Sequence, residues 1–232
     1  AIMRKVFSNI DFSNEKFPFM FFNNFKYLDT EIRIMRASFT GELGYEIYVP
    51  PKYALDLWKK IFHNGKNLGL IPYGTETMHL LRAEKGYIVV GQDTDGTVTP
   101  IDLNLNWMIG KNKKDFIGKR SLTRSDTSRK DRKQLVGILP IDKNKNILEG
   151  QHILENKSLP KKIVEPIEYI GHITSSYLSP TLKHYVAMAL IKDGNKLMGK
   201  QVFVSDPLSF KTIPVKIVNP VFLDPENKRL LS

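Results

Sequence analysis

The sequence of 232 residues contains no cysteine, which excludes disulfides, thiolate metal ligands and cysteine nucleophiles. This absence also fits a reducing compartment, and we expect the protein to be cytoplasmic. No apolar run approaches the roughly 18 residues that a membrane-spanning helix needs, so we expect no membrane partner. The first residues contain neither an initiator methionine nor the apolar stretch of a secretory signal, and we expect the chain to be part of a longer protein.

Acidic residues are scarce as well: 24 Asp and Glu stand against 35 Lys and Arg, which gives a net charge of +11. The excess is concentrated in residues 111–133, "KNKKDFIGKRSLTRSDTSRKDRK", where ten residues are basic and three are acidic. Such a run is typical of a solvated connector, and an anion site or a nucleic-acid surface are the alternatives. Phe116 is the only aromatic residue in the run, which disfavours stacking of bases, and we expect no nucleic-acid partner.

The first half of the sequence mixes strand and helix patterns. Residues 11–25, rich in phenylalanine and interrupted by Pro18, indicate a turn followed by a buried strand. Residues 32–39 and 43–49 predict two paired strands around the turn Thr40-Gly41-Glu42. In the second strand, alternation places Leu43, Tyr45, Ile47 and Val49 on one face.

The helix patterns are interrupted by glycine and proline. Residues 2–7 indicate a short helix, and a longer helix begins at Pro51 with the apolar stripe Leu55, Trp58, Ile61 and Phe62. A further helix follows Thr75 and ends at Gly86. The next residues, "YIVVG", predict a short buried strand before the turn-rich loop "QDTDGTVTP".

From residue 134 the pattern becomes all β. Short strand-like runs, separated by Gly, Pro, Asn and Asp, are typical of a small sandwich or barrel: "QLVGILPI", "YIGHITSSYL", "YVAMALIK", "KQVFVS" and "TIPVKIVNPVFL". We therefore predict an α+β part over residues 1–123, a basic connector over 124–133 and a C-terminal all-β barrel over 134–232.

Common site motifs fail in this sequence. "GKNKKDFIGKRS" has the wrong spacing for a phosphate loop, and "DTDG" at 93–96 lacks the later glycine and glutamate of a calcium loop. The five histidines contain no i,i+4 pair, so we predict no metal site. The sequence assigns no catalytic residue.

Several longer segments carry a resemblance. "SFTGELGYEIYVP" resembles the Thr-Gly-Glu segment of the aminomethyltransferase family, the folate-binding T-protein of glycine cleavage. "LLRAEKGYIVVGQDTDGTVTP" is similar to the arginine-containing helix and following loop of that family, in the form found in α subunits of heterotetrameric sarcosine oxidases. "WMIGKNKKDFIGKRSL", "DRKQLVGILP", "IGHITSSYLSPTL" and "NPVFLDPENKR" resemble the C-terminal part of those subunits. Together these segments cover nearly the whole chain, in order.

The resemblance implies a folate-binding (aminomethyltransferase-like) part with four site residues. Glu42 would bind the pterin of tetrahydrofolate, because a carboxylate offers two acceptors to the two adjacent N–H donors of the pterin edge. Arg82 would be the arginine of the folate site, and Tyr45 and Trp107 would wall the pocket. The alternatives are a solvated turn for Glu42, a helix ion pair with Glu76 or Glu84 for Arg82, and plain core positions for the two aromatic residues.

The resemblance also implies an activity. Within a sarcosine oxidase, this part would capture the one-carbon unit from sarcosine as 5,10-methylenetetrahydrofolate, while flavin and NAD would lie on other parts of the complex. The implied partners are the other sarcosine oxidase subunits and folate. An aminomethyltransferase, a dimethylglycine-dehydrogenase-like protein, or a non-catalytic folate-binding or RNA-contacting module are the alternatives. The family's folate domain begins before this chain, so we expect half a folate site and an inactive isolated fragment.

Overall fold

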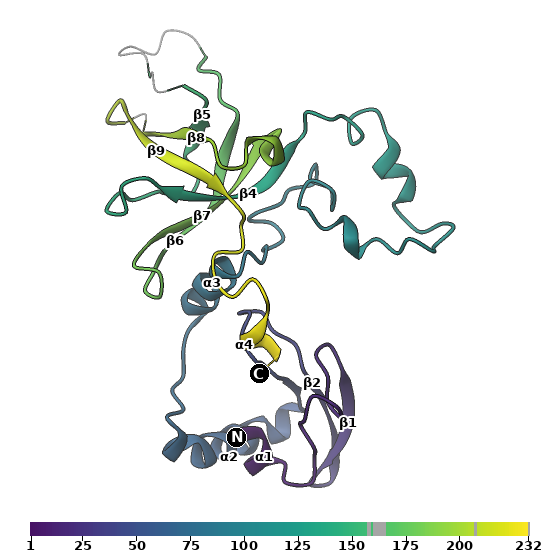
Figure 1. Cartoon of the computed structure of the whole chain (residues 1–232). Coiled ribbons are helices and arrows are strands. Elements are labelled where there is room, and N and C mark those ends of the chain that lie inside the picture. Colours follow the sequence, from purple (N-terminus) through teal and green to yellow (C-terminus); the bar gives the residue numbers. More distant parts are fainter. Residues whose placement is uncertain (157–158, 160–165, 207, 232) are drawn as a thin grey trace. The chain divides into compact units, whose positions relative to one another are not determined.

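A computed structural model describes residues 1–156, 159, 166–206 and 208–231, in two compact units (Figure 1). Unit 1 contains residues 1–81 and the segment that begins at Glu226, and unit 2 contains residues 82–225. The basic segment 124–133, where we predict a domain boundary, therefore lies inside unit 2. The boundary itself stays a prediction.

Unit 1 is built around a three-stranded antiparallel sheet in the order β1-β2-β3. In the register of β2 and β3, Ile34 lies opposite Ile47, as expected for two strands joined around the Thr-Gly-Glu turn. The strands are shorter than predicted, because residues 36–45 form an irregular loop. The elements are α1 (Ile2–Val6), β1 (Phe22–Tyr27), β2 (Thr30–Met35), β3 (Glu46–Tyr48), α2 (Pro51–Gly65), the 3-10 turn η1 (Lys66–Leu68), α3 (Thr75–Glu84), which runs on into unit 2, and α4 (Lys228–Leu231).

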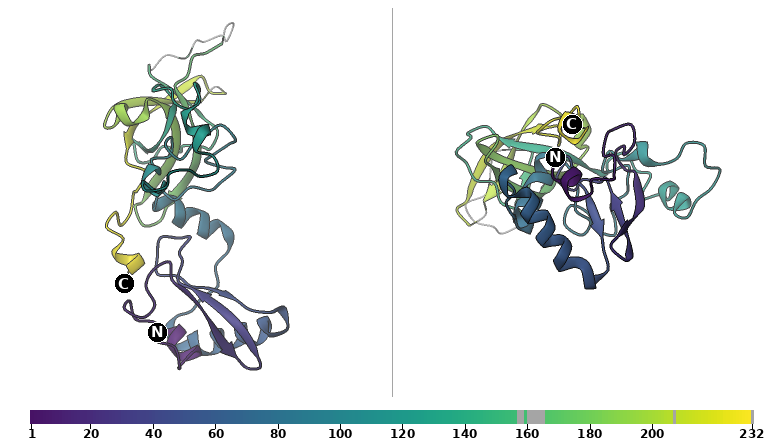
Figure 2. Two further views of the ribbon diagram at one scale, coloured as in Figure 1. Left: turned by 90° about the vertical axis from the view of Figure 1, so that its right-hand side faces the viewer. Right: turned by 90° about the horizontal axis from the view of Figure 1, so that it is seen from below.

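The α2 helix lies along this sheet and contributes to the core of unit 1 (Figure 2). Its buried side chain is Leu57, which is 3% exposed and belongs to one cluster with Ile32 and Ile34 of β2. The predicted stripe is only partly correct: Ile61 packs against the same cluster, whereas Leu55 and Trp58 are 63% and 57% exposed. The helix has apolar residues on two faces, and the sheet covers only the face with Leu57.

The segment before the sheet also differs from its prediction. β1 is not a buried strand: it lies at an edge of the sheet, and most of its side chains are exposed. Phe17, in the preceding turn, is instead the buried residue, at 2% exposed, in the cluster that holds Phe12 and Ile32. The phenylalanines of this stretch therefore build the core from the turn rather than from the strand.

Unit 2 contains a closed six-stranded antiparallel barrel in the order β4-β7-β6-β5-β8-β9. This confirms the prediction of an α+β part followed by an all-β barrel. The strands predicted from residue 134 onward are all present, and β5 is an additional short one. The elements are η2 (Asn106–Met108), η3 (Lys119–Thr123), β4 (Lys133–Pro140), β5 (His152–Leu154), β6 (Gly171–Ser179), β7 (His184–Lys192), η4 (Gly194–Leu197), β8 (Gln201–Asp206) and β9 (Lys211–Val218).

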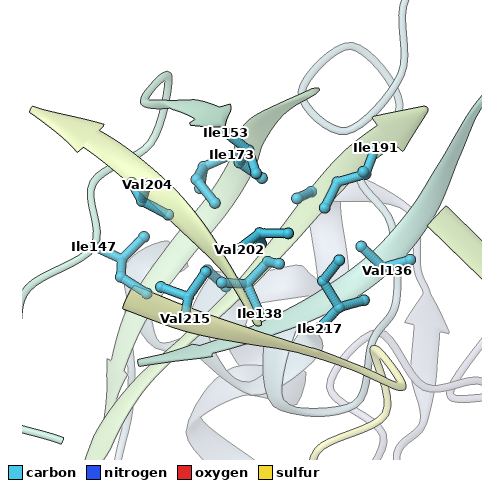
Figure 3. Close-up of a cluster of buried hydrophobic side chains, with 12 residues drawn as sticks. Val136, Ile138, Ile147, Ile153, Ile173, Ile191, Val202, Val204, Val215 and Ile217 are labelled. Carbon is cyan, nitrogen blue, oxygen red and sulfur yellow. The ribbon is translucent and has the colours of Figure 1, made fainter. Parts of the chain in front are cut away.

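The barrel interior is filled by β-branched side chains (Figure 3). Val136, Ile138, Ile173, Ile191 and Val215 are 0% exposed and come from four different strands. Such residues favour strands because their branched side chains pack well on a pleated surface. The interior is therefore an apolar core.

The strand predicted over residues 87–91 is wrong. This segment forms no strand, and its one β contact is an isolated bridge between Val90 and Thr94. Val90 is 83% exposed. Strand propensity alone does not make a strand where no neighbouring strand offers a ladder of hydrogen bonds.

Candidate functional site

Glu42 lies in the irregular loop 36–45, whose shape depends on two glycines. Gly41 has φ +78°, a conformation that other residues adopt at a cost. A Cβ on Gly44 would lie 2.7 Å from the carbonyl oxygen of Ala37, so the two ends of the loop pass too closely for a side chain. The Ser38 hydroxyl donates to the Glu42 carbonyl at 2.6 Å and closes the loop. The glycines thus support a tight loop that presents a carboxylate.

The Glu42 carboxylate contacts a distant part of the sequence. Arg229 donates from Nη1 to Oε1 of Glu42 at 3.0 Å, and the side chains are 49% and 40% exposed. The adjacent backbone N–H of Leu43 donates to the Arg229 carbonyl at 3.2 Å. Glu42 is therefore a half-exposed, ion-paired acceptor rather than a simple solvated turn residue.

A cavity of about 650 Å³ lies beside this loop within unit 1. Leu43 and Tyr45 line it together with Phe12, Arg4 and Arg36. Burial raises the pKa of the Tyr45 phenol, although the positive charges of Arg36 and Arg4 oppose the shift. The cavity thus combines aromatic walls with two cations, a lining that suits a planar and partly anionic ligand.

Arg36 joins the cavity wall to the interior of unit 1. The residue is 2% exposed, and its Nη1 donates to the Phe17 carbonyl at 3.0 Å and to the amide oxygen of Asn14. Its Nε has no hydrogen-bond partner among the residues that the structure describes. A buried arginine of this kind holds the base of the loop in place.

Arg82 lies in the interior of unit 2, where its side chain is 0% exposed. Nη1 donates to the Asp93 carboxylate and to the Tyr87 carbonyl, and Nη2 donates to Gln92 and to the Ser175 hydroxyl. The ion pair is therefore made with Asp93 and not with either glutamate of the helix. The role of Arg82 in a folate site stays a prediction, and the geometry gives it a structural function.

Trp107 is 72% exposed, so it is not a core residue. It lies in the 3-10 turn η2, next to Leu105 and Met108, which line a mainly apolar cavity of about 700 Å³ in unit 2. Its place in a pocket wall stays a prediction. Glu42 and Tyr45 thus belong to unit 1, and Arg82 and Trp107 belong to unit 2.

Three site residues escaped the sequence analysis. Asp93 carries a signal in the acidic loop "QDTDG", but its spacing suggests a calcium loop rather than a partner for Arg82. Arg36 and Arg229 carried none, because an arginine beside a strand or near a basic tail is common in a sequence with this charge. Only the folded chain brings Arg229 to Glu42, from 187 residues away.

The described part of the chain contains no group of three or more residues suited to hold a metal ion, and none of its helices has the length and hydropathy to cross a bilayer.

The chain therefore contains an α+β unit whose loop presents a carboxylate, followed in sequence by a closed six-stranded barrel. A solved aminomethyltransferase T of the glycine cleavage system from Bartonella henselae matches 87% of this chain with a TM-score of 0.71 and 27% identity, over 52% of its own length. Residues 1–113 match the GCVT N-terminal domain, and residues 133–224 match the glycine cleavage T-protein C-terminal barrel domain. The chain belongs to the glycine cleavage T-protein family.

Two groups of curated relatives refine this assignment. The sarcosine oxidase subunit alpha of Corynebacterium sp. (strain U-96) is 42% identical over 98% of this chain, and an aminomethyltransferase of Thermoanaerobacter sp. (strain X514) is 34% identical over 87%. The chain spans 23% of the first relative and 51% of the second. Both relatives have the names of enzymes, and the resemblance to sarcosine oxidase α subunits is confirmed.

Proposed function

We propose that this chain is the folate-binding part of a sarcosine-oxidase-type α subunit, with Glu42 as the residue that holds the pterin. The observation that carries the proposal is the carboxylate of Glu42 on a loop shaped by Gly41 and Gly44, beside an aromatic and cationic cavity. The higher identity and fuller coverage by the sarcosine oxidase subunit favour this function over that of an aminomethyltransferase.

The residues of unit 1 fit such a ligand. A pterin edge has two adjacent N–H donors, and an ionised carboxylate accepts both in a fork. Tyr45 and Phe12 offer flat apolar surface for the ring, and the exposed Arg4 offers positive charge for a carboxylate of a folate tail. A cavity of about 650 Å³ is in the usual range for small-molecule sites.

Bound tetrahydrofolate would supply the nucleophilic nitrogens that take up a one-carbon unit, giving 5,10-methylenetetrahydrofolate. The contribution of this chain is to bind, to orient and to exclude water, and thereby to raise the effective concentration of the acceptor. The one-carbon unit would come from oxidation of the N-methyl group of sarcosine elsewhere in the complex. The remaining subunits, with flavin and NAD, are the partners that this proposal requires.

Titration of the complete protein with tetrahydrofolate tests the role of Glu42. Glu42→Gln keeps the shape but turns one acceptor oxygen toward an amide NH₂, which loses a charge-assisted bond and leaves a donor unpaired. We expect binding to weaken by about 2–4 kcal/mol, or roughly 30- to 1,000-fold. The control is Glu46→Gln on β3, which removes the same charge from a residue that bonds to Tyr48. If the two variants bound tetrahydrofolate equally well, Glu42 would have only a structural role.

A second measurement tests the reaction. In the complete complex oxidising sarcosine with tetrahydrofolate present, Glu42→Gln should divert the one-carbon unit from the folate product to free formaldehyde, at an unchanged rate of sarcosine oxidation. An unchanged product ratio would argue against capture at this site. Steeply salt-dependent RNA binding without any folate binding would favour the RNA-contacting alternative.

A further inference from the structure

The segment 226–231 is held firmly within unit 1. The Leu43 N–H donates to the Arg229 carbonyl at 3.2 Å, and the Asn14 side-chain amide donates to the Leu231 carbonyl at 2.9 Å. The side chain of Leu230 is 4% exposed. The segment is thus anchored by one backbone hydrogen bond, one hydrogen bond from a side chain and a buried leucine, and its position relative to the glutamate loop is fixed.

The orientation of the Glu42 side chain depends on this segment. The loop itself holds the backbone of Glu42, through the bond from Ser38 to its carbonyl. The carboxylate is held by Arg229, whose Nη1 lies 3.0 Å from Oε1. A glutamate has three rotatable side-chain bonds, and a charge-assisted bond to an arginine of the anchored segment restricts them before any ligand arrives.

We propose that segment 226–231 is a positioning element of the folate site, and that Arg229 orients the Glu42 carboxylate for the pterin. This inference rests on the function proposed above for Glu42. An ionised carboxylate has about four acceptor positions, so it accepts from the guanidinium and from two pterin donors together. A half-exposed ion pair contributes little to folding stability, and the effect of Arg229 should therefore be seen in ligand affinity.

The test uses the complete protein and tetrahydrofolate as the probe. Arg229→Ala removes the orienting contact, and we expect affinity to fall about tenfold, which corresponds to a coupling of about 1.4 kcal/mol. Arg229→Lys keeps the charge without the planar fork and should restore part of the loss. Lys228→Ala is the matched control: it removes the same charge from the neighbouring residue, which pairs with Glu226. Its affinity should stay within about twofold of wild type, and the melting temperatures of all variants should agree.

The double variant Arg229→Ala, Glu42→Gln separates positioning from an independent role. If Arg229 acts through Glu42, its removal costs little more affinity once the carboxylate is gone. A full additional tenfold loss in the double variant would overturn the inference, as would Arg229→Ala binding as tightly as Lys228→Ala while Glu42→Gln alone binds weakly. If Glu42→Gln bound tetrahydrofolate as tightly as wild type, the proposed function of Glu42 would be wrong, and this inference with it.

Discussion

Arg82 and Asp93 form an ion pair in the interior of unit 2, and both side chains are 0% exposed. Asp93 also accepts hydrogen bonds from the hydroxyls of Thr174 and Ser175 on β6, each at 2.6 Å, and from the Val89 N–H at 2.9 Å. One carboxylate therefore joins the end of α3, the loop that follows it and a barrel strand. The loop has little regular structure, and this network fixes its course.

Loss of the Asp93 charge should destabilise the protein strongly. Asp93→Asn leaves the Arg82 guanidinium buried without a counter-charge, and breaking a buried pair in this way costs about 3–5 kcal/mol. Asp95→Asn is the control, because Asp95 lies two residues further on in an exposed turn and bonds to Thr97. Urea unfolding of both variants measures the difference. Similar stabilities would show that the interior tolerates an unpaired arginine.

The second prediction tests which face of α2 is buried, and it uses two leucines of this helix. Leu57→Ala leaves a cavity beside the sheet and should lower the free energy of unfolding by about 2–4 kcal/mol. Leu55→Ala changes a side chain that is 63% exposed and should lower it by less than about 0.5 kcal/mol. Thermal and urea unfolding of the two variants make the comparison. The reverse order would mean that the apolar stripe read from the sequence is the buried one.

Most of the fold was predictable from the sequence, and the errors have a common cause. The barrel strands were found because runs such as "YVAMALIK" are rich in β-branched residues and bounded by turns. The stripe of α2 is only partly predicted: Ile61 faces the core, but Trp58 and Phe62 pack on each other, with ring centroids 4.7 Å apart, and Trp58 is exposed. Apolar periodicity shows that a helix is amphipathic, but neighbouring elements decide which face is buried.

The candidate site was predictable only in part. Local sequence identified Glu42, because the glycines around it predict a tight loop and the family resemblance supplies a ligand. The partner Arg229 was not predictable, since a contact over 187 residues leaves no local pattern. Asp93 is hard to predict for a related reason: helix spacing points from Arg82 to acids on its own helix, whereas its partner lies 11 residues on, in the loop that follows.

Limited proteolysis tests the proposed domain organisation. We predict that trypsin first cleaves the native protein within the basic connector 124–133, after Arg124, Arg129 or Lys130, which are exposed and lie outside strands. Arg132 should resist, because its side chain is only 11% exposed and pairs with Asp102. Mass spectrometry of the first fragments identifies the sites. Initial cleavage within β7 or between β2 and β3 would contradict the domain boundary that we predict in the basic connector.

The pair of Asp102 and Arg132 should make stability depend on pH in the acidic range. Burial by itself would raise the pKa of Asp102, but hydrogen bonds from Arg132 and Thr99 outweigh it and hold the pKa below 3.8. Arg132 donates to the two carboxylate oxygens at 2.9 and 2.8 Å, and the Thr99 N–H donates at 2.8 Å. A group whose pKa is lower in the folded state stabilises the fold above its unfolded pKa, and this contribution is lost as pH falls through the folded pKa.

Asp102→Asn should therefore cost about 2–3 kcal/mol of unfolding free energy at neutral pH. The difference between wild type and variant should begin to shrink below about pH 5, because the Asp102 carboxylate of the unfolded chain becomes protonated there, and it should go on shrinking until pH falls through the lowered pKa of the folded state. Asp131→Asn serves as the control, since Asp131 is 45% exposed where it pairs with Arg129 and Lys192, and its removal should change stability little at any pH. Urea unfolding at several pH values makes the measurement. A difference that stays constant down to pH 3 would show that Asp102 acts through its shape and neutral hydrogen bonds, and not through its charge.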